Sequence, residues 1–336
     1  MKHNAIDLHC DSVFSLMDGK DLRQNVESVH LDIPRLRQGN VGLQVFAAYV
    51  PPDTPEDTAF AYTSARLDAI DALAHSDERL SPVETAAELR AILALEKTGI
   101  MAAVENGLAI ESKASLEKLE LLRRRKVRIM TLVHSKHLPW VESCTGTGEF
   151  ASDGLSAFGE EVVDAMNDLG IIPDLSHSSE RAFWAVLKRS KKPVIASHSC
   201  AYSICAALRN LKDDQLKALG DSGGIVGVNF FSAFLSEPFR QCHEKNKRSE
   251  TPVPNTVQVP HTIIADHIDH MVKMAGEDCV ALGSDFDGVR ALPNGVTGSD
   301  YYPVLEQELR SRGYTETLIE KIFSGNFLRV LEQWDS

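Results

Sequence analysis

The sequence predicts an α/β protein built on a closed (β/α)8 barrel of the kind seen in metal-dependent hydrolases. Three observations support this: eight short apolar segments rich in β-branched residues, helical segments between them, and polar residues where most of the strands end. An open doubly wound sheet is the alternative, but no G-x-G-x-x-G motif follows the first strand. Barrels of this type reach the length of this chain as one unit, so we expect a single domain over residues 1–336.

The predicted strands and helices alternate along the chain. The strands are residues 5–9, 42–50, 100–105, 128–134, 171–177, 194–198, 225–230 and 279–285. The helices are residues 59–75, 115–125, 158–169, 179–189, 213–219 and 262–275. Gly170 stands where a C-cap glycine is typical, and Ser179 stands at an N-cap position. The polar, proline-containing stretch 237–260 predicts an inserted loop or lid over one barrel face.

Composition excludes several classes of partner. The 35 Lys+Arg and 48 Asp+Glu residues give a formal net charge of −13, which disfavours nucleic acid and anionic membranes as partners. No apolar stretch approaches the roughly 20 residues of a membrane span. The first strand begins too early for a signal peptide to precede it, and the six scattered cysteines predict free thiols. We therefore expect a cytoplasmic protein.

Acidic residues and histidines mark the ends of most predicted strands. They are Asp7, His9 and Asp11, then Glu105, His134, Asp174 and His177, Ser197 and His198, and finally Asp285 and Asp287. In a barrel the C-terminal ends of the strands meet on one face, so these side chains are expected to form one cluster. Each one alone has a structural explanation, such as a turn or a hydrogen-bonded histidine, but their coincidence at strand ends favours a metal-dependent hydrolase.

Imidazole and carboxylate groups suit zinc or a similar divalent ion. Residues two apart on a strand point to the same side, so His9 and Asp11 could bind the same ion. The cluster holds more candidate ligands than one tetrahedral ion needs, which predicts two ions that share a bridging carboxylate. Two ions about 3.5–4 Å apart can hold a hydroxide nucleophile and polarise a carbonyl or phosphoryl oxygen.

Several segments along nearly the whole chain carry a family resemblance. They are DLHCD at 7–11, VENG at 104–107, TLVH at 131–134, DLSHSS at 174–179, PVIASHSCA at 193–201, LRN at 208–210, GSDFDGV at 283–289 and GNFLRV at 325–330. Through them the sequence resembles the renal (membrane) dipeptidase family, which are zinc peptidases with a barrel fold. It looks like a soluble bacterial-type member of that family.

The resemblance implies five protein ligands for two zinc ions. They are His9 and Asp11 for one ion, His177 and His198 for the other, and Glu105 as the carboxylate that bridges both. It also implies that His134 contacts the substrate and stabilises the tetrahedral intermediate, that Arg209 binds the carboxylate of the dipeptide, and that Asp285 is the general acid/base.

The predicted function is therefore a binuclear zinc dipeptidase that cleaves dipeptides through a metal-bridging hydroxide, and the resemblance implies L-Xaa-D-Xaa dipeptides as a substrate class. A homodimer is what the family suggests. One alternative is an amidohydrolase-like barrel hydrolase that acts on another amide, a lactone or a phosphoester. Many such barrels carry His-x-His on the first strand, whereas this chain has His9 and Asp11. The other alternative is a metal-binding or interaction protein without activity, which is disfavoured because every expected ligand position is filled.

Overall fold

The computed structural model describes residues 3–110, 116–247, 249 and 255–336. In this part of the chain all strands pair in parallel, and the sheet closes on itself because β2 pairs with both β1 and β4. The strands are β1 (Ala5–Cys10), β2 (Val41–Tyr49), β3 (Leu80–Pro82), β4 (Thr98–Glu105), β5 (Ile129–Thr131), β6 (Ile172–Asp174), β7 (Ile195–Ser199), β8 (Ile225–Val228) and β9 (Val280–Leu282). The short β3 pairs with β4 alone, so the other eight strands form the barrel wall, as predicted.

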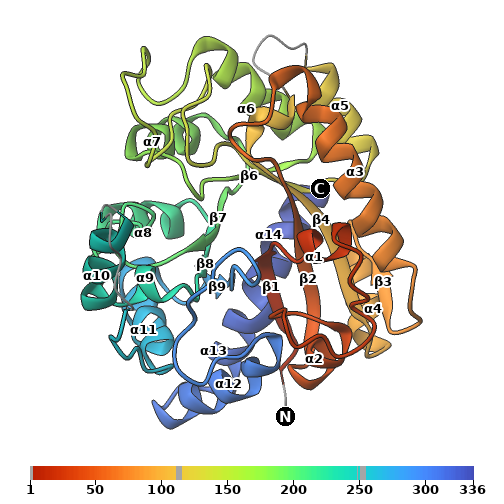
Figure 1. Ribbon diagram of the computed structural model, residues 1–336. Coiled ribbons are helices and arrows are strands. Elements are labelled where there is room, and N and C mark those ends of the chain that lie inside the picture. Colours follow the sequence, from red (N-terminus) through yellow and green to blue (C-terminus); the bar gives the residue numbers. More distant parts are fainter. Residues whose placement is uncertain (1–2, 111–115, 248, 250–254) are drawn as a thin grey trace.

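Figure 1 shows the helices arranged around these strands. They are α1 (Val13–Met17), α2 (Ile33–Gln38), α3 (Glu56–Ala74), α4 (Ala86–Ala94), α5 (Glu117–Arg124), α6 (Ala157–Leu169), α7 (Glu180–Arg189), α8 (Asp213–Asp221), α9 (Ser232–Leu235), α10 (Glu237–Lys247), α11 (Ile263–Ala275), α12 (Tyr302–Ser311), α13 (Glu316–Glu320) and α14 (Asn326–Asp335). All six predicted helices are present, although the predicted start of α5 at residue 115 lies outside the described residues. None of the helices described is both long enough and apolar enough to cross a membrane.

The two predicted helix caps are confirmed. Gly170 ends α6 in the left-handed conformation at φ 74°, and its N–H bonds the carbonyl of Met166. The side chain of Ser179 begins α7 by accepting a hydrogen bond from the N–H of Ala182. These caps satisfy backbone groups that a helix end otherwise leaves unpaired, and they set where α7 leaves the loop that carries His177.

Apolar side chains close the N-terminal end of the barrel. The first residues of four strands pack in one buried cluster with the C-terminal helix α14. The cluster includes Ile129, Ile172, Ile195 and Ile225 from the strands and Phe327, Leu331 and Trp334 from α14. Because apolar side chains fill this end, the space for a binding site lies at the opposite end, where the strands finish.

Three strands end three residues earlier than predicted. β5, β6 and β9 stop at Thr131, Asp174 and Leu282, so His134, His177 and Asp285 lie in the following loops. His177 and Asp285 have φ values of 68° and 64°, which a β-strand cannot contain. The apolar pattern runs on past each strand end because these loop residues remain largely buried.

The prediction of a loop over the whole of 237–260 is wrong for its first half, which forms α10. Phe239 is the only buried residue of this helix, so its composition resembles that of a loop. Residues 248 and 250–254 of the predicted loop lie outside the described residues.

Candidate active site

The structure brings seven of the predicted site residues together at the C-terminal end of the barrel. They are His9, Asp11, Glu105, His134, His177, His198 and Asp285. Glu105, the last residue of β4, lies at the centre of the cluster. Its Oε1 is 3.1 Å from Nε2 of His177 and 3.7 Å from Nε2 of His198. Its Oε2 is 3.6 Å from Nε2 of His9, so the two carboxylate oxygens face different groups of ligands.

The remaining donor atoms lie on two sides of Glu105. On one side, Nε2 of His9 is 3.7 Å from Oδ2 of Asp11 and 4.0 Å from Oδ1 of Asp285. On the other side, the Nε2 atoms of His177 and His198 are 3.1 Å apart. The two groups meet at His198, whose ring also lies 3.8 Å from that of His9, so the donor atoms form one continuous cluster around Glu105.

The donor set fits metal ions. Nε2 of His9 and Oδ1 of Asp11 are buried without a hydrogen-bond partner among the described residues, and such unpaired groups are costly unless a cation satisfies them. Imidazole nitrogens and carboxylate oxygens are the ligands that zinc takes in catalytic sites. The residues present therefore suit zinc.

The pKa values point the same way. Burial raises the pKa of Asp11 to about 6 and that of Asp285 to about 7, and the nearby carboxylate of Glu105 adds to both shifts. Burial also lowers the pKa of His177 and His198 well below the usual value, with Arg209 adding to both shifts. At His9 burial also lowers the pKa, but the carboxylates of Glu105 and Asp11 outweigh burial and hold the pKa well above its usual value. Such an excess of buried negative charge favours the binding of a cation in place of protons.

Left-handed backbone conformations collect at this site. Asn106, His177, Asp285 and Asp287 have φ values of 87°, 68°, 64° and 66°, and they are four of the seven non-glycine residues with positive φ in the described chain. Such conformations are costly for residues with a side chain and persist where the surrounding structure enforces them. At His177 and Asp285 they turn the side chains towards Glu105 and His9.

Two neighbours hold Asp285 in place. Asn229, which follows β8, donates a hydrogen bond from Nδ2 to Oδ2 of Asp285 over 2.8 Å. Gly288 leaves room for the carboxylates, because a Cβ there would lie 2.4 Å from Oδ1 of Asp285 and 2.1 Å from Oδ2 of Asp11. Asp285 is thereby fixed with Oδ1 directed towards His9.

Two further residues at this site, Tyr49 and Asn229, were not predicted from the sequence. Tyr49 ends β2, and its hydroxyl is 3.4 Å from Nδ1 of His134. Asn229 lies just beyond the end of β8. β2 and β8 are the barrel strands for which no polar end residue was predicted. The prediction looked for acidic residues and histidines at strand ends, which we call the strand-end rule. The same rule would have found both residues if it had included tyrosine and asparagine.

A cavity of about 370 Å³ opens onto the cluster, and a second of about 210 Å³ adjoins it. Both are lined by His134, His177, Phe231, Phe234 and Lys247. The two phenylalanines form an apolar wall, while the histidines belong to the cluster around Glu105. The two cavities thus offer room for a small molecule beside the polar cluster.

Arg209, the eighth predicted site residue, lies beside this cluster at the edge of the smaller cavity. It is 6% exposed, and its Nη2 donates to the carbonyl of His198 over 3.0 Å. Within the described part of the chain it forms no ion pair with a carboxylate. A buried guanidinium without an acidic partner is suited to bind the carboxylate of a ligand.

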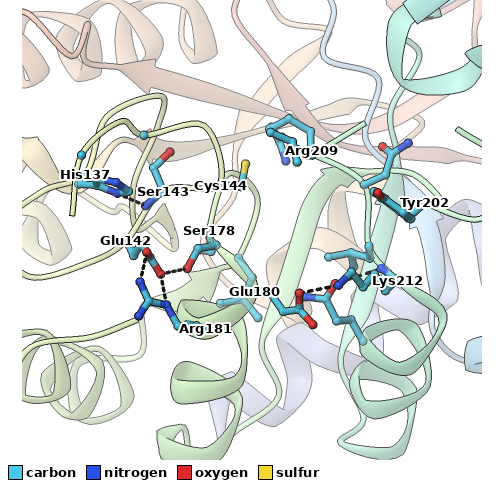
Figure 2. A pocket seen from close by; sticks show the side chains of 18 residues that line it. His137, Glu142, Ser143, Cys144, Ser178, Glu180, Arg181, Tyr202, Arg209 and Lys212 are labelled. Carbon is cyan, nitrogen blue, oxygen red and sulfur yellow. Dashed lines mark hydrogen bonds and ion pairs between the residues drawn. The ribbon is translucent and has the colours of Figure 1, made fainter. Parts of the chain in front are cut away.

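Arg209 also borders a neighbouring cavity of about 440 Å³, which we call the side cavity, between the loops after β5, β6 and β7. Figure 2 shows Arg209 at one edge of the side cavity, away from the ion pairs Glu142–Arg181 and Glu180–Lys212. None of the seven clustered residues lines this cavity. Because the other charges shown are paired with each other, Arg209 is the cation left for a ligand.

A (β/α)8 barrel with a buried cluster of histidines and carboxylates at the C-terminal ends of its strands is typical of metal-dependent hydrolases. A sequence model of the membrane dipeptidase family, peptidase family M19, matches residues 1–336. The chain belongs to that family.

Relatives agree with this assignment. The chain is 33% identical to Dipeptidase 3 of Mus musculus over 98% of its own length and 63% of the relative, and 32% identical to Dipeptidase 3 of Homo sapiens over 95% and 65%. It therefore spans about three fifths of the length of the curated relatives it matches. A solved metallopeptidase from Rhodobacter sphaeroides, liganded with a phosphinate mimic of L-Ala-D-Ala, has a TM-score of 0.86 at 26% identity, with 99% of both chains covered. The solved dipeptidase AC of family M19 has a TM-score of 0.87 at 27% identity, with both chains covered in full.

Proposed function

We propose that the protein is a zinc dipeptidase that holds two ions through His9, Asp11, Glu105, His177 and His198. The observation that carries this proposal is the position of Glu105, whose two oxygens face His9 on one side and His177 and His198 on the other. One ion would lie with His9 and Asp11, the other with the two remaining histidines, and Glu105 would bridge both. When bound, zinc supplies a nucleophilic water at neutral pH and polarises the scissile carbonyl.

The chain's own residues would handle the substrate and its protons. His134 lines both cavities beside Glu105 and would donate a hydrogen bond to the carbonyl oxygen as negative charge develops on it. Asp285, aimed by Asn229, would accept a proton from the attacking water and pass it to the leaving amine. Arg209 would bind the free carboxylate of the dipeptide, which limits the substrate to a short peptide.

We further propose L-Xaa-D-Xaa dipeptides as substrates. Support comes from the Rhodobacter sphaeroides metallopeptidase, which was solved with a mimic of L-Ala-D-Ala. Release of free amino acids from matched L,D and L,L dipeptides by the zinc-loaded protein tests both proposals. Zinc-dependent release is expected, with L,D preferred; activity on lactones or phosphoesters instead would favour the alternative barrel hydrolase.

Arg209→Ala is expected to raise KM about 10–100-fold for dipeptides with a free carboxylate, because a charge-assisted hydrogen bond contributes about 1.5–3 kcal/mol. Dipeptide amides lack that carboxylate and should lose little. Arg240→Ala is the matched control, since it removes a guanidinium that lines the same cavity but is already paired with Glu237 and Glu244. Equal losses on free and amidated dipeptides would contradict the role of Arg209.

The homodimer, the cytoplasmic location and a lid formed by residues 237–260 stay predictions. α10 supports the last of these in part, because Arg240, His243 and Lys247 of this helix line the smaller cavity. We therefore propose that α10 forms the first part of a lid over the smaller cavity.

A further inference from the structure

Two pairs of buried side chains below the proposed zinc site repeat one hydrogen-bond pattern. Oδ1 of Asp7 accepts from the N–H two residues further on and from the N–H of Ser284, while its Oδ2 accepts from Oγ of Ser284 over 2.6 Å. Oδ1 of Asp174 likewise accepts from the N–H two residues further on and from the N–H of Ser197, while its Oδ2 accepts from Oγ of Ser197 over 2.6 Å. We call Asp7–Ser284 and Asp174–Ser197 the two Asp–Ser brackets.

The brackets also share their place in the barrel. Each joins an aspartate on one strand to a serine at the end of the neighbouring parallel strand, β1 with β9 and β6 with β7. In both, the serine lies two residues beyond the pairing partner of the aspartate, which is Leu282 in β9 and Ile195 in β7. Both aspartates and both serines are fully buried. The two brackets therefore share their position in the barrel and the pattern above, although Oδ2 of Asp174 also accepts a hydrogen bond from Oγ1 of Thr131.

They differ in what the serine touches next. Oγ of Ser197 is 2.8 Å from Nδ1 of His198, whereas Ser284 precedes Asp285 and contacts no imidazole in the described structure. The hydroxyl of Ser197 donates its proton to the carboxylate of Asp174, so its oxygen is left to accept from Nδ1–H of His198. A proton on Nδ1 leaves the Nε2 lone pair free, and Nε2 is the atom that faces Glu105 and His177.

We propose that Asp174 and Ser197 are positioning residues that fix His198 in the tautomer able to bind metal, while the equivalent Asp7–Ser284 bracket holds only the backbone. Hydrogen-bond partners of this kind orient metal-binding histidines and raise their basicity. The inference rests on the proposed zinc site, and it concerns residues to which that proposal gives no role.

The two serines provide a matched pair of variants. Ser197→Ala and Ser284→Ala each remove a buried hydroxyl that donates to an aspartate over the same distance, so the metal-free proteins should lose similar thermal stability. Zinc affinity and stoichiometry of the full chain would be measured by competition with a chelator. Ser197→Ala is expected to weaken the binding of one ion about 10–100-fold. Ser284→Ala is expected to bind both ions as the unsubstituted protein does.

Asp174→Asn provides a second variant in case Ser197→Ala does not fold. An amide in place of the carboxylate can donate to Oγ of Ser197, whose proton would then turn to Nδ1 of His198 and force the proton of His198 onto Nε2. We expect zinc affinity to fall at least as far as in Ser197→Ala. Unchanged affinity in the Ser197 and Asp174 variants, or an equal loss in Ser284→Ala, would overturn the inference. If the unsubstituted protein binds only one zinc ion, the two-ion proposal fails. The zinc affinities of Ser197→Ala and Ser284→Ala for that single ion would then still show whether Ser197 positions His198.

Discussion

Asp285→Asn is expected to lower kcat for dipeptide hydrolysis about 10²–10⁴-fold, the usual contribution of a general acid or base, with zinc content unchanged. An amide has the shape of the carboxylate but cannot take a proton from water and deliver it to the leaving amine. The loss should appear in kcat rather than KM, because the carboxylate of the substrate is proposed to bind elsewhere, at Arg209. Turnover and zinc content measured on the same preparation check this.

Asp53→Asn is the matched control for that substitution. Asp53 lies in the loop after β2, where its exposed carboxylate forms an ion pair with Lys136. The Asp53→Asn substitution removes one negative charge, as Asp285→Asn does, but it lies outside the proposed site. We therefore expect kcat to change by less than twofold. Retained turnover in Asp285→Asn would remove Asp285 from the mechanism, and loss of zinc in that variant would show that it acts as a ligand instead.

The strand-end rule predicted most of the site because barrel topology is encoded locally. Each strand is a short apolar run, and the barrel brings the ends of all runs to one face whatever lies between them in sequence. His9, Glu105 and His198, which lie on strands that end near the predicted positions, were placed by this rule alone. Distant residues could thus be grouped without any knowledge of their contacts.

Loop conformation and hydrogen-bond direction could not be predicted in the same way. His177 and Asp285 were assigned to strands, yet they reach the site through left-handed turns that depend on tertiary contacts. Asp7 and Asp174 were recognised as polar strand ends, but their bonds to Ser284 and Ser197 depend on the register of neighbouring strands. A single sequence carries no direct signal for that register. α10 was missed for another reason, since it has almost no apolar face to reveal it.

Glu105→Gln is expected to disrupt both proposed metal positions at once. Its two carboxylate oxygens lie 3.1–3.9 Å from Nε2 of His9, His134, His177 and His198, and an amide can offer only one acceptor oxygen in their place. Loss of a shared ligand should reduce zinc affinity by more than the roughly 10–100-fold typical of an outer hydrogen-bond partner. Dipeptidase activity measured at a fixed concentration of free zinc should fall as the zinc affinity falls.

Glu142→Gln separates this effect from the general cost of altering a buried carboxylate. Glu142 is 8% exposed on the same face of the barrel, where it lines the side cavity and pairs with Arg181 rather than with any proposed ligand. The Glu142→Gln substitution should lower the thermal unfolding midpoint, but the protein should still bind two zinc ions. If Glu105→Gln instead lost one ion and kept the other at full affinity, Glu105 would belong to a single metal position, because a bridging carboxylate cannot be removed from one ion alone.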